Sequence, residues 1–159
     1  MKIFIDEKLK DCITEEWIRK VLSIVPAKIL KDLIVKVVDP TKYWKKMREQ
    51  ELIKNWDRED IQEELWKRSR LGFSPKKKEV VIEVRKRAWK YYGFKRDIAR
   101  TLFHEVYHAN DFEDVEEGEY GKLVSREEYR KHPRENRARD FEENMFRSLK
   151  GKRELFKAN

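Results

Sequence analysis

The stretch DIARTLFHEVYHAN, residues 97–110, is the part of the sequence from which the fold is best predicted. Its apolar side chains recur at the three- and four-residue spacing of one helix face, at Ile98, Leu102, Val106 and Ala109. We therefore predict a helix over Asp97 to Asn110 that turns this stripe toward the core. His104 and His108 fall outside the stripe, so core packing does not account for them.

Five residues of this helix, His104-Glu105-Val106-Tyr107-His108, form an HExxH motif. Side chains four residues apart lie one above the other on a helix, so two imidazoles can bind one metal ion. The adjacent Glu105 can then act as general base toward a metal-bound water. Zinc suits this chemistry because it lowers the pKa of that water to about 7. The alternative is a pair of solvated histidines, but two of the three histidines in the chain fall in this motif.

A catalytic zinc usually has three protein ligands, so a third ligand has to be found. Glu135 is the favoured candidate, because it lies three residues before Ala138 and continues the apolar stripe of a predicted last helix. A carboxylate on that packed side needs an ionic partner or a metal. The alternative is a surface glutamate in the first turn after Pro133, where the helix dipole favours acidic residues.

Asp114 is the competing third ligand. It lies six residues after His108, the spacing of HExxHxxGxxD enzymes. That arrangement needs a sharp turn at the glycine position, which is Asp111 here, and aspartate tolerates a left-handed backbone better than most residues. The acidic residues around Asp114 favour a solvated loop, so the sequence leaves both candidates open and favours Glu135.

The remaining patterns predict a protein of mixed helices and strands. Short runs rich in apolar and β-branched residues predict strands at Lys2 to Ile5, Leu33 to Val38 and Glu79 to Arg85. Helical spacing or capping signals predict helices at Asp11 to Ile24, Tyr43 to Trp56, Asp57 to Gly72 and Glu135 to Lys150. We predict loops at Phe73 to Lys78, which is basic, and at Asp111 to Gly121, which is acidic.

Composition excludes several classes of protein. The 159 residues are 44% charged and 39% hydrophobic, with a formal net charge of +8. One cysteine excludes a disulfide framework and a cysteine-based zinc ribbon. We find no apolar run long enough for a membrane span and no signal-peptide pattern, and so expect a cytoplasmic protein without a membrane partner. The many Glu and Lys residues are typical of a thermophile.

The segment HPRENRARDF, residues 132–141, is similar to the E-x-x-A-x-x-F segment of small ImmA/IrrE-like peptidases and minigluzincins. With the HExxH motif, residues 79–149 resemble zinc metallopeptidases of the gluzincin type. The resemblance implies zinc ligands His104, His108 and Glu135, with Glu105 as general base. Many of these peptidases carry a second Glu directly before the Ala, where this chain has Arg137; a ligand at that position would be lacking here.

The resemblance also implies an α+β, zincin-like fold. We expect a small, twisted, mostly antiparallel sheet, an HExxH active-site helix and a second ligand-bearing helix. Glu79 to Arg85 would be an edge strand that pairs with extended substrate. We expect one domain over 1–159, with a catalytic core at 76–150 and a loosely covered part at 1–75 that contains a charged helical insertion.

An oxyanion intermediate needs a hydrogen-bond donor. Gluzincins often use a Tyr or His outside the HExxH helix, and the resemblance makes His132 and Tyr129 candidates. His132 is alternatively a surface residue beside Pro133. Asp111 is a candidate for hydrogen bonding a ligand imidazole, and Tyr107 is expected to pack.

These residues predict a zinc-dependent metallopeptidase that hydrolyses peptide or protein substrates. One alternative is a catalytically silent regulatory or binding protein with the same fold. Another is a nucleic-acid-binding protein, because basic runs such as residues 76–78 and 85–87 lie near aromatic residues 89–94. A solvated face of a highly charged protein is the favoured explanation of these runs, because charge alone does not define a binding site. We further hypothesise that the tail, residues 151–159, lies in the cleft and restrains activity.

Overall fold

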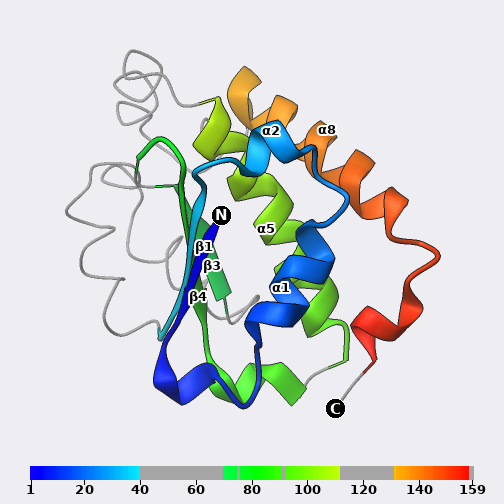
Figure 1. The fold of residues 1–159 in the computed structure, drawn as a ribbon. Coiled ribbons are helices and arrows are strands. Elements are labelled where there is room, and N and C mark those ends of the chain that lie inside the picture. The colour runs from blue at the N-terminus through cyan, green and yellow to red at the C-terminus, as the bar shows by residue number, and fades with distance from the viewer. Residues whose placement is uncertain (40–69, 75, 91, 112–130, 158–159) are drawn as a thin grey trace.

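The strands within the described residues form one mixed sheet. A computed structural model describes residues 1–39, 70–74, 76–90, 92–111 and 131–157. The strand order is β1-β2-β4-β3 (Figure 1), with β1 at Lys2–Ile5, β2 at Ile34–Val38, β3 at Arg70–Phe73 and β4 at Glu79–Val84. β1, β2 and β4 are parallel neighbours, and only β3 pairs antiparallel, with β4. The mixed class is confirmed, but the expected mostly antiparallel sheet is wrong.

The connection between β1 and β2 explains why these strands are parallel. The chain leaves β1 and passes through α1 (Glu15–Leu22) and α2 (Ala27–Leu30) before it enters β2. A helical crossover returns the chain to the starting end of the sheet, so the next strand runs in the same direction. Thr14 begins α1 as its N-cap and accepts a hydrogen bond from the Trp17 backbone N–H at 3.1 Å.

β4 is an inner strand, and the expectation that Glu79 to Arg85 forms an edge is wrong. It hydrogen-bonds to β2 on one side and to β3 on the other. All six of its residues are buried, which is the pattern of a strand covered on both faces. The predicted face of Val80, Ile82 and Val84 does belong to the hydrophobic core. β3 is the end strand of the described sheet, on the side away from β1.

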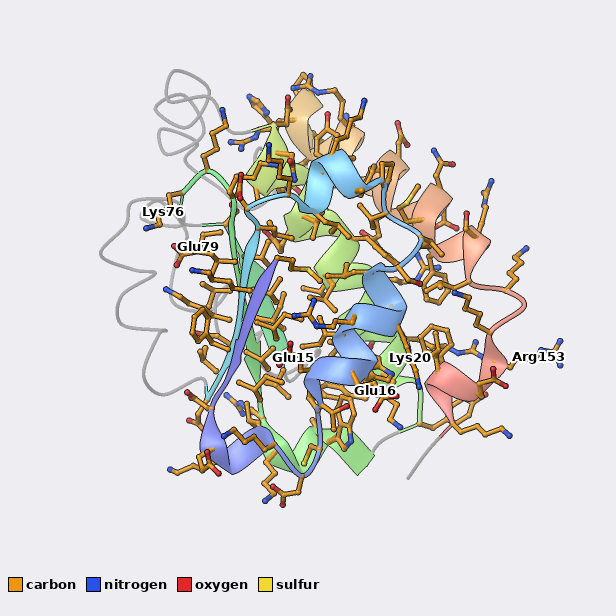
Figure 2. All side chains as sticks on the ribbon, in the orientation of Figure 1. Glu15, Glu16, Lys20, Lys76, Glu79 and Arg153 are labelled. Atoms are coloured by element: carbon orange, nitrogen blue, oxygen red, sulfur yellow. The ribbon has the colours of Figure 1, made fainter. Side chains whose placement is uncertain are left out.

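The helices build a second and a third layer. α1 and α5 (Phe94–Asn110) cover one face of the sheet, and α8 (Pro133–Ser148) lies on α5 (Figure 1). The predicted stripe of α5 is buried in the core, as is Leu149 at the end of α8, which confirms both predicted core stripes in outline. Lys76 and Glu79 lie on the sheet face opposite α1 (Figure 2). The 3-10 helices are η1 (Glu7–Leu9), η2 (Lys86–Lys90) and η3 (Arg153–Phe156).

Two other expectations change around β3. The sequence pattern predicts that Gly72 ends a helix and that Phe73 begins a basic loop, but both lie in β3. The predicted helices between residues 43 and 69 and the acidic loop after Asp111 lie outside the described residues. Within the described parts of the chain, no helix is long and apolar enough to cross a membrane.

The C-terminal tail packs away from the predicted cleft. Leu155 of η3 is buried in the core, and its carbonyl oxygen accepts a hydrogen bond of 2.8 Å from the Trp17 indole. Phe156 packs against Phe146 near the C-terminal end of α8. The two histidines lie in the last turns of α5. The tail instead contacts the first turn of α5, where the Lys95 ammonium donates a hydrogen bond to the Lys157 carbonyl. Apolar burial therefore holds the described part of the tail away from the histidines, which contradicts its expected place in the cleft. The expected restraint of activity stays a prediction.

Candidate metal centre

Two helices bring three donor side chains together. His104 and His108 lie one turn apart on α5, with ring centroids 4.8 Å apart. Glu135 lies in the first turn of α8, is 3% exposed and reaches both rings. Its carboxylate oxygens lie 2.8 Å from His108 Nε2 and 3.1 Å from His104 Nε2. The three residues thus form a group that could hold a metal ion, with ligand atoms all within 4.8 Å of one another.

The spacing of the donors fits zinc. The two Nε2 atoms are 3.2 Å apart. Ligands at about 2.1 Å from a tetrahedral zinc lie about 3.4 Å from one another, so the observed separations of 2.8 to 3.2 Å need to open by about 0.2 to 0.6 Å. Two imidazole nitrogens and one carboxylate oxygen are also a donor set that catalytic zinc sites use.

Local sequence explains why Glu135 faces α5. Pro133 occupies the first turn of α8, where its missing N–H costs nothing. His132 is the N-cap and its Nδ1 accepts a hydrogen bond of 3.2 Å from the Arg134 backbone N–H. One turn beyond Glu135, Ala138 is fully buried, and its small side chain allows the two helices to approach closely. The stripe argument from the sequence therefore predicted the orientation of Glu135 correctly.

The charges around His104 favour a cation. Burial opposes its protonation, but hydrogen bonds to Glu135 and Glu142 outweigh burial and raise the pKa of His104 to about 10. Burial likewise opposes ionisation of Glu135, yet the two imidazoles hold its pKa well below the usual range. In the chain alone a proton on His104 balances these carboxylates. A bound metal ion would supply the same positive charge.

Glu105 stands apart from the three donors. It is 7% exposed and lies on the same helix turn as His104. Burial raises the pKa of its carboxyl, and the neighbouring imidazoles and Arg134 oppose that rise in part. A carboxyl with a raised pKa is better matched to proton transfer near neutral pH than an ordinary glutamate.

Glu142 contacts His104 at Nδ1, the ring nitrogen that faces away from the other donors. The sequence prediction missed this contact. His104 Nδ1 lies 3.2 Å from Glu142 Oε2. Arg100 in turn donates to the other Glu142 oxygen at 3.4 Å and to Glu143 at 2.7 Å. A carboxylate on the outer nitrogen of a ligand imidazole fixes its tautomer and orientation. The spacing gave a signal, because Glu142 lies two helical turns after Glu135 and so on the same face.

Arg134 was also missed. It is 3% exposed, and its guanidinium donates to the His108 carbonyl at 3.3 Å. This bond ties the start of α8 to the C-terminal end of α5, where backbone carbonyls lack helical partners. It therefore holds together the two helix ends from which Glu135 and His108 project.

Asp111 does not contact a ligand imidazole in the way the sequence suggested, and Arg137 occupies it instead. Asp111 was a candidate partner of a ligand imidazole, but it pairs with Arg137 at 3.3 Å instead. Arg137 also donates to the Tyr107 hydroxyl at 3.2 Å. It therefore braces the outside of the α5–α8 contact, and Glu135 reaches both histidines without any shift of the helix.

The other candidate residues are not joined to this group in the described contacts. The hydrogen bond described for His132 lies within the start of α8. Tyr129 and Asp114 fall outside the described residues. The catalytic roles of His132 and Tyr129 stay predictions.

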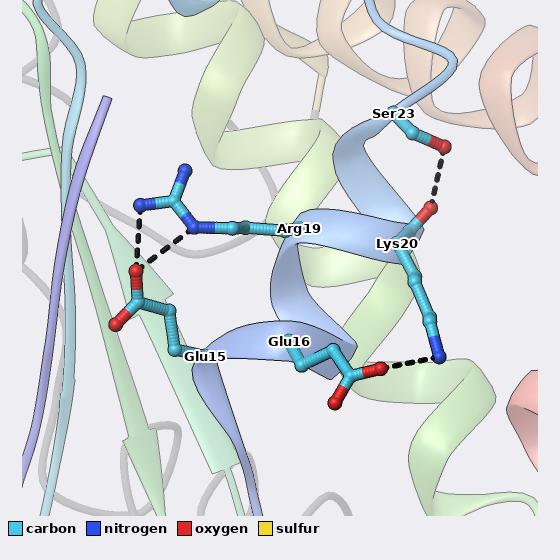
Figure 3. Close-up of a pocket in the computed structure, with 5 residues that line it drawn as sticks. All are labelled: Glu15, Glu16, Arg19, Lys20 and Ser23. Atoms are coloured by element: carbon cyan, nitrogen blue, oxygen red, sulfur yellow. Dashed lines mark hydrogen bonds and ion pairs between the residues drawn. The ribbon is translucent and has the colours of Figure 1, made fainter.

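A surface hollow on α1 offers no comparable chemistry. Its lining is shown in Figure 3 and consists of Glu15, Glu16, Arg19, Lys20 and Ser23. Arg19 pairs with Glu15 at 2.6 Å and Lys20 with Glu16 at 2.7 Å, each one helical turn apart. These exposed pairs support α1, and each contributes little to stability.

Comparison of the chain with models of protein families, with curated proteins and with solved structures gives no significant match.

Proposed function

We propose that the protein is a zinc-dependent metallopeptidase. The observation that carries this proposal is the convergence of His104, His108 and Glu135, with ligand atoms within 4.8 Å of one another, beside Glu105 on the same helix. The donor types, their spacing and the adjacent buried carboxyl support zinc-assisted hydrolysis more than a structural zinc site. A structural site usually has four protein ligands, whereas the described residues offer three, which leave a coordination position open.

Each residue has a defined role in the proposed reaction. Zinc bound at this site would lower the pKa of a water molecule and polarise the scissile carbonyl. Glu105 accepts the proton of the attacking water and passes it to the leaving amine. Glu142 holds His104 in the tautomer that presents Nε2 to the site. His132 and Tyr129 remain the proposed oxyanion donors.

Extended substrate would pair with β3. The resemblance to gluzincins implied an edge strand for this role, and β4 is an inner strand. β3 is the end strand of the described sheet, and Gly72 within it lies directly beside Glu105. A peptide that adds to this edge would gain backbone hydrogen bonds close to the proposed base.

The test is cleavage of a peptide library by zinc-loaded protein, with Glu105→Gln as the decisive variant. We expect Glu105→Gln to bind zinc as wild type does and to lose cleavage by a factor of at least about 100, since general-base catalysis contributes about 100- to 10,000-fold. Glu16→Gln, which changes an exposed glutamate of α1, is the matched control and should cleave normally.

Two outcomes would count against the proposal. Retained cleavage in Glu105→Gln would remove the role of Glu105. A wild-type protein that binds zinc but cleaves no peptide of the library would favour the regulatory or binding alternative.

A further inference from the structure

β3 packs close against α5 at Gly72. A methyl group in place of its hydrogen would lie 2.4 Å from Thr101 Cγ2, 2.9 Å from Glu105 Cγ and 3.2 Å from Ile82 Cδ1. Carbon atoms of different residues do not approach within 3.0 Å without a shift, so alanine does not fit here without moving its neighbours. Only the lack of a side chain allows β3 to lie at this distance from α5.

Backbone conformation does not explain this glycine. Gly93 is the glycine with positive φ, at 81°, in the described residues. Gly72 sits in a regular strand and pairs with Ile82, so other residues could adopt its backbone angles. Space is therefore what requires glycine at position 72.

Two of the neighbours of Gly72, Thr101 and Glu105, belong to α5. Thr101 and Glu105 are one turn apart and so share the face toward β3, while His104 and His108 face α8. Thr101 is branched at Cβ, and its hydroxyl donates to the Asp97 carbonyl at 2.9 Å, which holds its rotamer. Thr101 therefore cannot turn away easily, and a side chain at position 72 would also press on Glu105.

Packing rather than hydrogen bonding orients Glu105. Within the described ranges, no hydrogen bond contributes to the environment of its carboxyl, which burial and nearby charges determine. Its Cγ lies 2.9 Å from the position that a Cβ atom would take at Gly72. The position of β3 thus limits where the Glu105 side chain can lie.

We propose that Gly72 is a positioning residue for Glu105. Because it has no side chain, β3 can pack directly on Thr101 and Glu105, which sets the direction in which the Glu105 carboxylate projects. The catalytic part of this inference rests on the proposed peptidase function, whereas the contact itself does not.

The first test combines Gly72→Ala with Thr101→Ser. The serine removes the methyl group that collides with an alanine side chain at position 72 and keeps the hydroxyl that binds the Asp97 carbonyl. We expect Gly72→Ala to lower the urea midpoint of unfolding and Thr101→Ser to restore most of it. Gly151→Ala is the matched control, because nothing lies within 4 Å of a methyl group there.

Activity of the double variant separates positioning from packing. We expect kcat of Gly72→Ala/Thr101→Ser to be at least about 10-fold below that of Thr101→Ser, since a displacement of about 1 Å can cost about 100-fold. Zinc affinity should stay within about twofold, because the three metal-binding side chains face α8. KM should change less than kcat. Equal kcat in the two proteins would show that Gly72 serves packing alone and would overturn the proposal.

The second test does not need activity. This test is a double-mutant cycle in zinc-loaded protein. The fall in the urea midpoint of unfolding caused by Gly72→Ala is measured once with Glu105 present and once in the Glu105→Ala variant, which lacks the colliding Cγ. A smaller loss in the Glu105→Ala background supports the contact, and an equal loss in both backgrounds overturns it. If wild-type protein cleaves no peptide, the proposed function fails and this cycle still decides the positioning of Glu105.

Discussion

His104 has a carboxylate beside each of its two ring nitrogens. Glu135 lies 3.1 Å from its Nε2 and Glu142 lies 3.2 Å from its Nδ1. One carboxylate therefore shares the proposed metal with the ring, and the other orients the ring from behind. Because the two contacts use different nitrogens, they can be separated by mutation.

Removal of Glu142 should weaken zinc binding without removing a ligand. We expect Glu142→Ala to raise the Kd for zinc about 10- to 100-fold, the usual effect of losing such a support. Glu142→Gln should lose less, because its amide oxygen can still accept the Nδ1 proton. Zinc competition with a chromophoric chelator measures both, and exposed Glu154→Ala is the control. An unchanged Kd in Glu142→Ala would show that Glu142 does not support the ligand.

Glu83 should make stability depend on pH. Its side chain is fully buried in β4, and neither carboxylate oxygen has a hydrogen-bond partner among the described residues. Burial raises the pKa of Glu83 to about 8. The negative charge of Asp39 adds a smaller rise, and the positive charge of Arg85 opposes it. The folded protein therefore binds the proton more tightly than the unfolded chain does. This stabilisation is complete below about pH 4.5 and is lost as pH rises to about 8.

Glu83→Gln removes this titration. Between pH 5 and 8, the free energy of unfolding of the Glu83→Gln variant should fall less than that of wild type. The two falls should differ by an amount on the order of a few kcal/mol. Urea unfolding at several pH values measures the difference, with Glu16→Gln as control. Parallel profiles for wild type and Glu83→Gln would contradict the raised pKa.

The helices α5 and α8 supply all three metal-binding side chains of the candidate centre. Ala138 is fully buried where the two helices meet, one turn after Glu135. Its size sets how closely α8 approaches α5, and therefore whether Glu135 reaches both imidazoles. The strength of metal binding is thus coupled to the packing of two helices.

Ala138→Leu should disturb that packing. We expect a loss of about 1–3 kcal/mol in the free energy of unfolding, as for other overpacked cores, and weaker zinc binding because Glu135 moves from the histidines. Ala27→Leu, on the exposed side of α2, is the control. Urea unfolding and zinc titration give both values, and wild-type zinc affinity in Ala138→Leu would separate the site from the helix contact.

The elements that the sequence predicted well are those with a strong one-sided apolar pattern. The stripe through Leu102 and Val106 predicted α5, and the stripe through Ala138 predicted that Glu135 faces the packed side. Strand direction has no such signature, because an apolar run reads the same in parallel and antiparallel sheets. The unbroken apolar run Val80-Val81-Ile82 was the available sign in the sequence of an inner, parallel strand, and all six residues of β4 are buried.

β3 escapes prediction for a related reason. The sequence pattern makes Gly72 a helix end, although it is a strand residue whose small size serves a contact with α5. Such contacts between distant segments leave no local pattern. The same holds for Arg100 of α5, whose guanidinium donates a hydrogen bond to Glu142 of α8.

At the scale of the whole molecule, part of the basic surface is engaged internally. Lys76 pairs with Glu79 at 3.3 Å and Lys86 with Asp11 at 2.7 Å. Lys78 donates to Asn110, and Trp89 is 5% exposed within the core. These contacts agree with a solvated, ion-paired face. Nucleic-acid binding remains an untested alternative.

The tail should stabilise the fold and leave the metal centre unaffected. Leu155→Ala should cost about 2–5 kcal/mol in the free energy of unfolding, as buried leucines do, because Leu155 fills the core beside Trp17. The Kd for zinc should stay unchanged, since η3 packs at the other end of α5. Phe4→Ala, at a side chain 55% exposed, is the control. A tighter zinc site or faster cleavage in Leu155→Ala would return the tail to a restraining role.

The central claim is that His104, His108 and Glu135 bind one zinc ion, and metal content tests it most directly. Protein loaded with zinc and then freed of excess should retain about one zinc per chain, and Glu135→Ala should retain much less under the same conditions. A wild-type protein that retains no zinc would contradict the claim. So would Glu135→Ala protein that retains as much zinc as wild type.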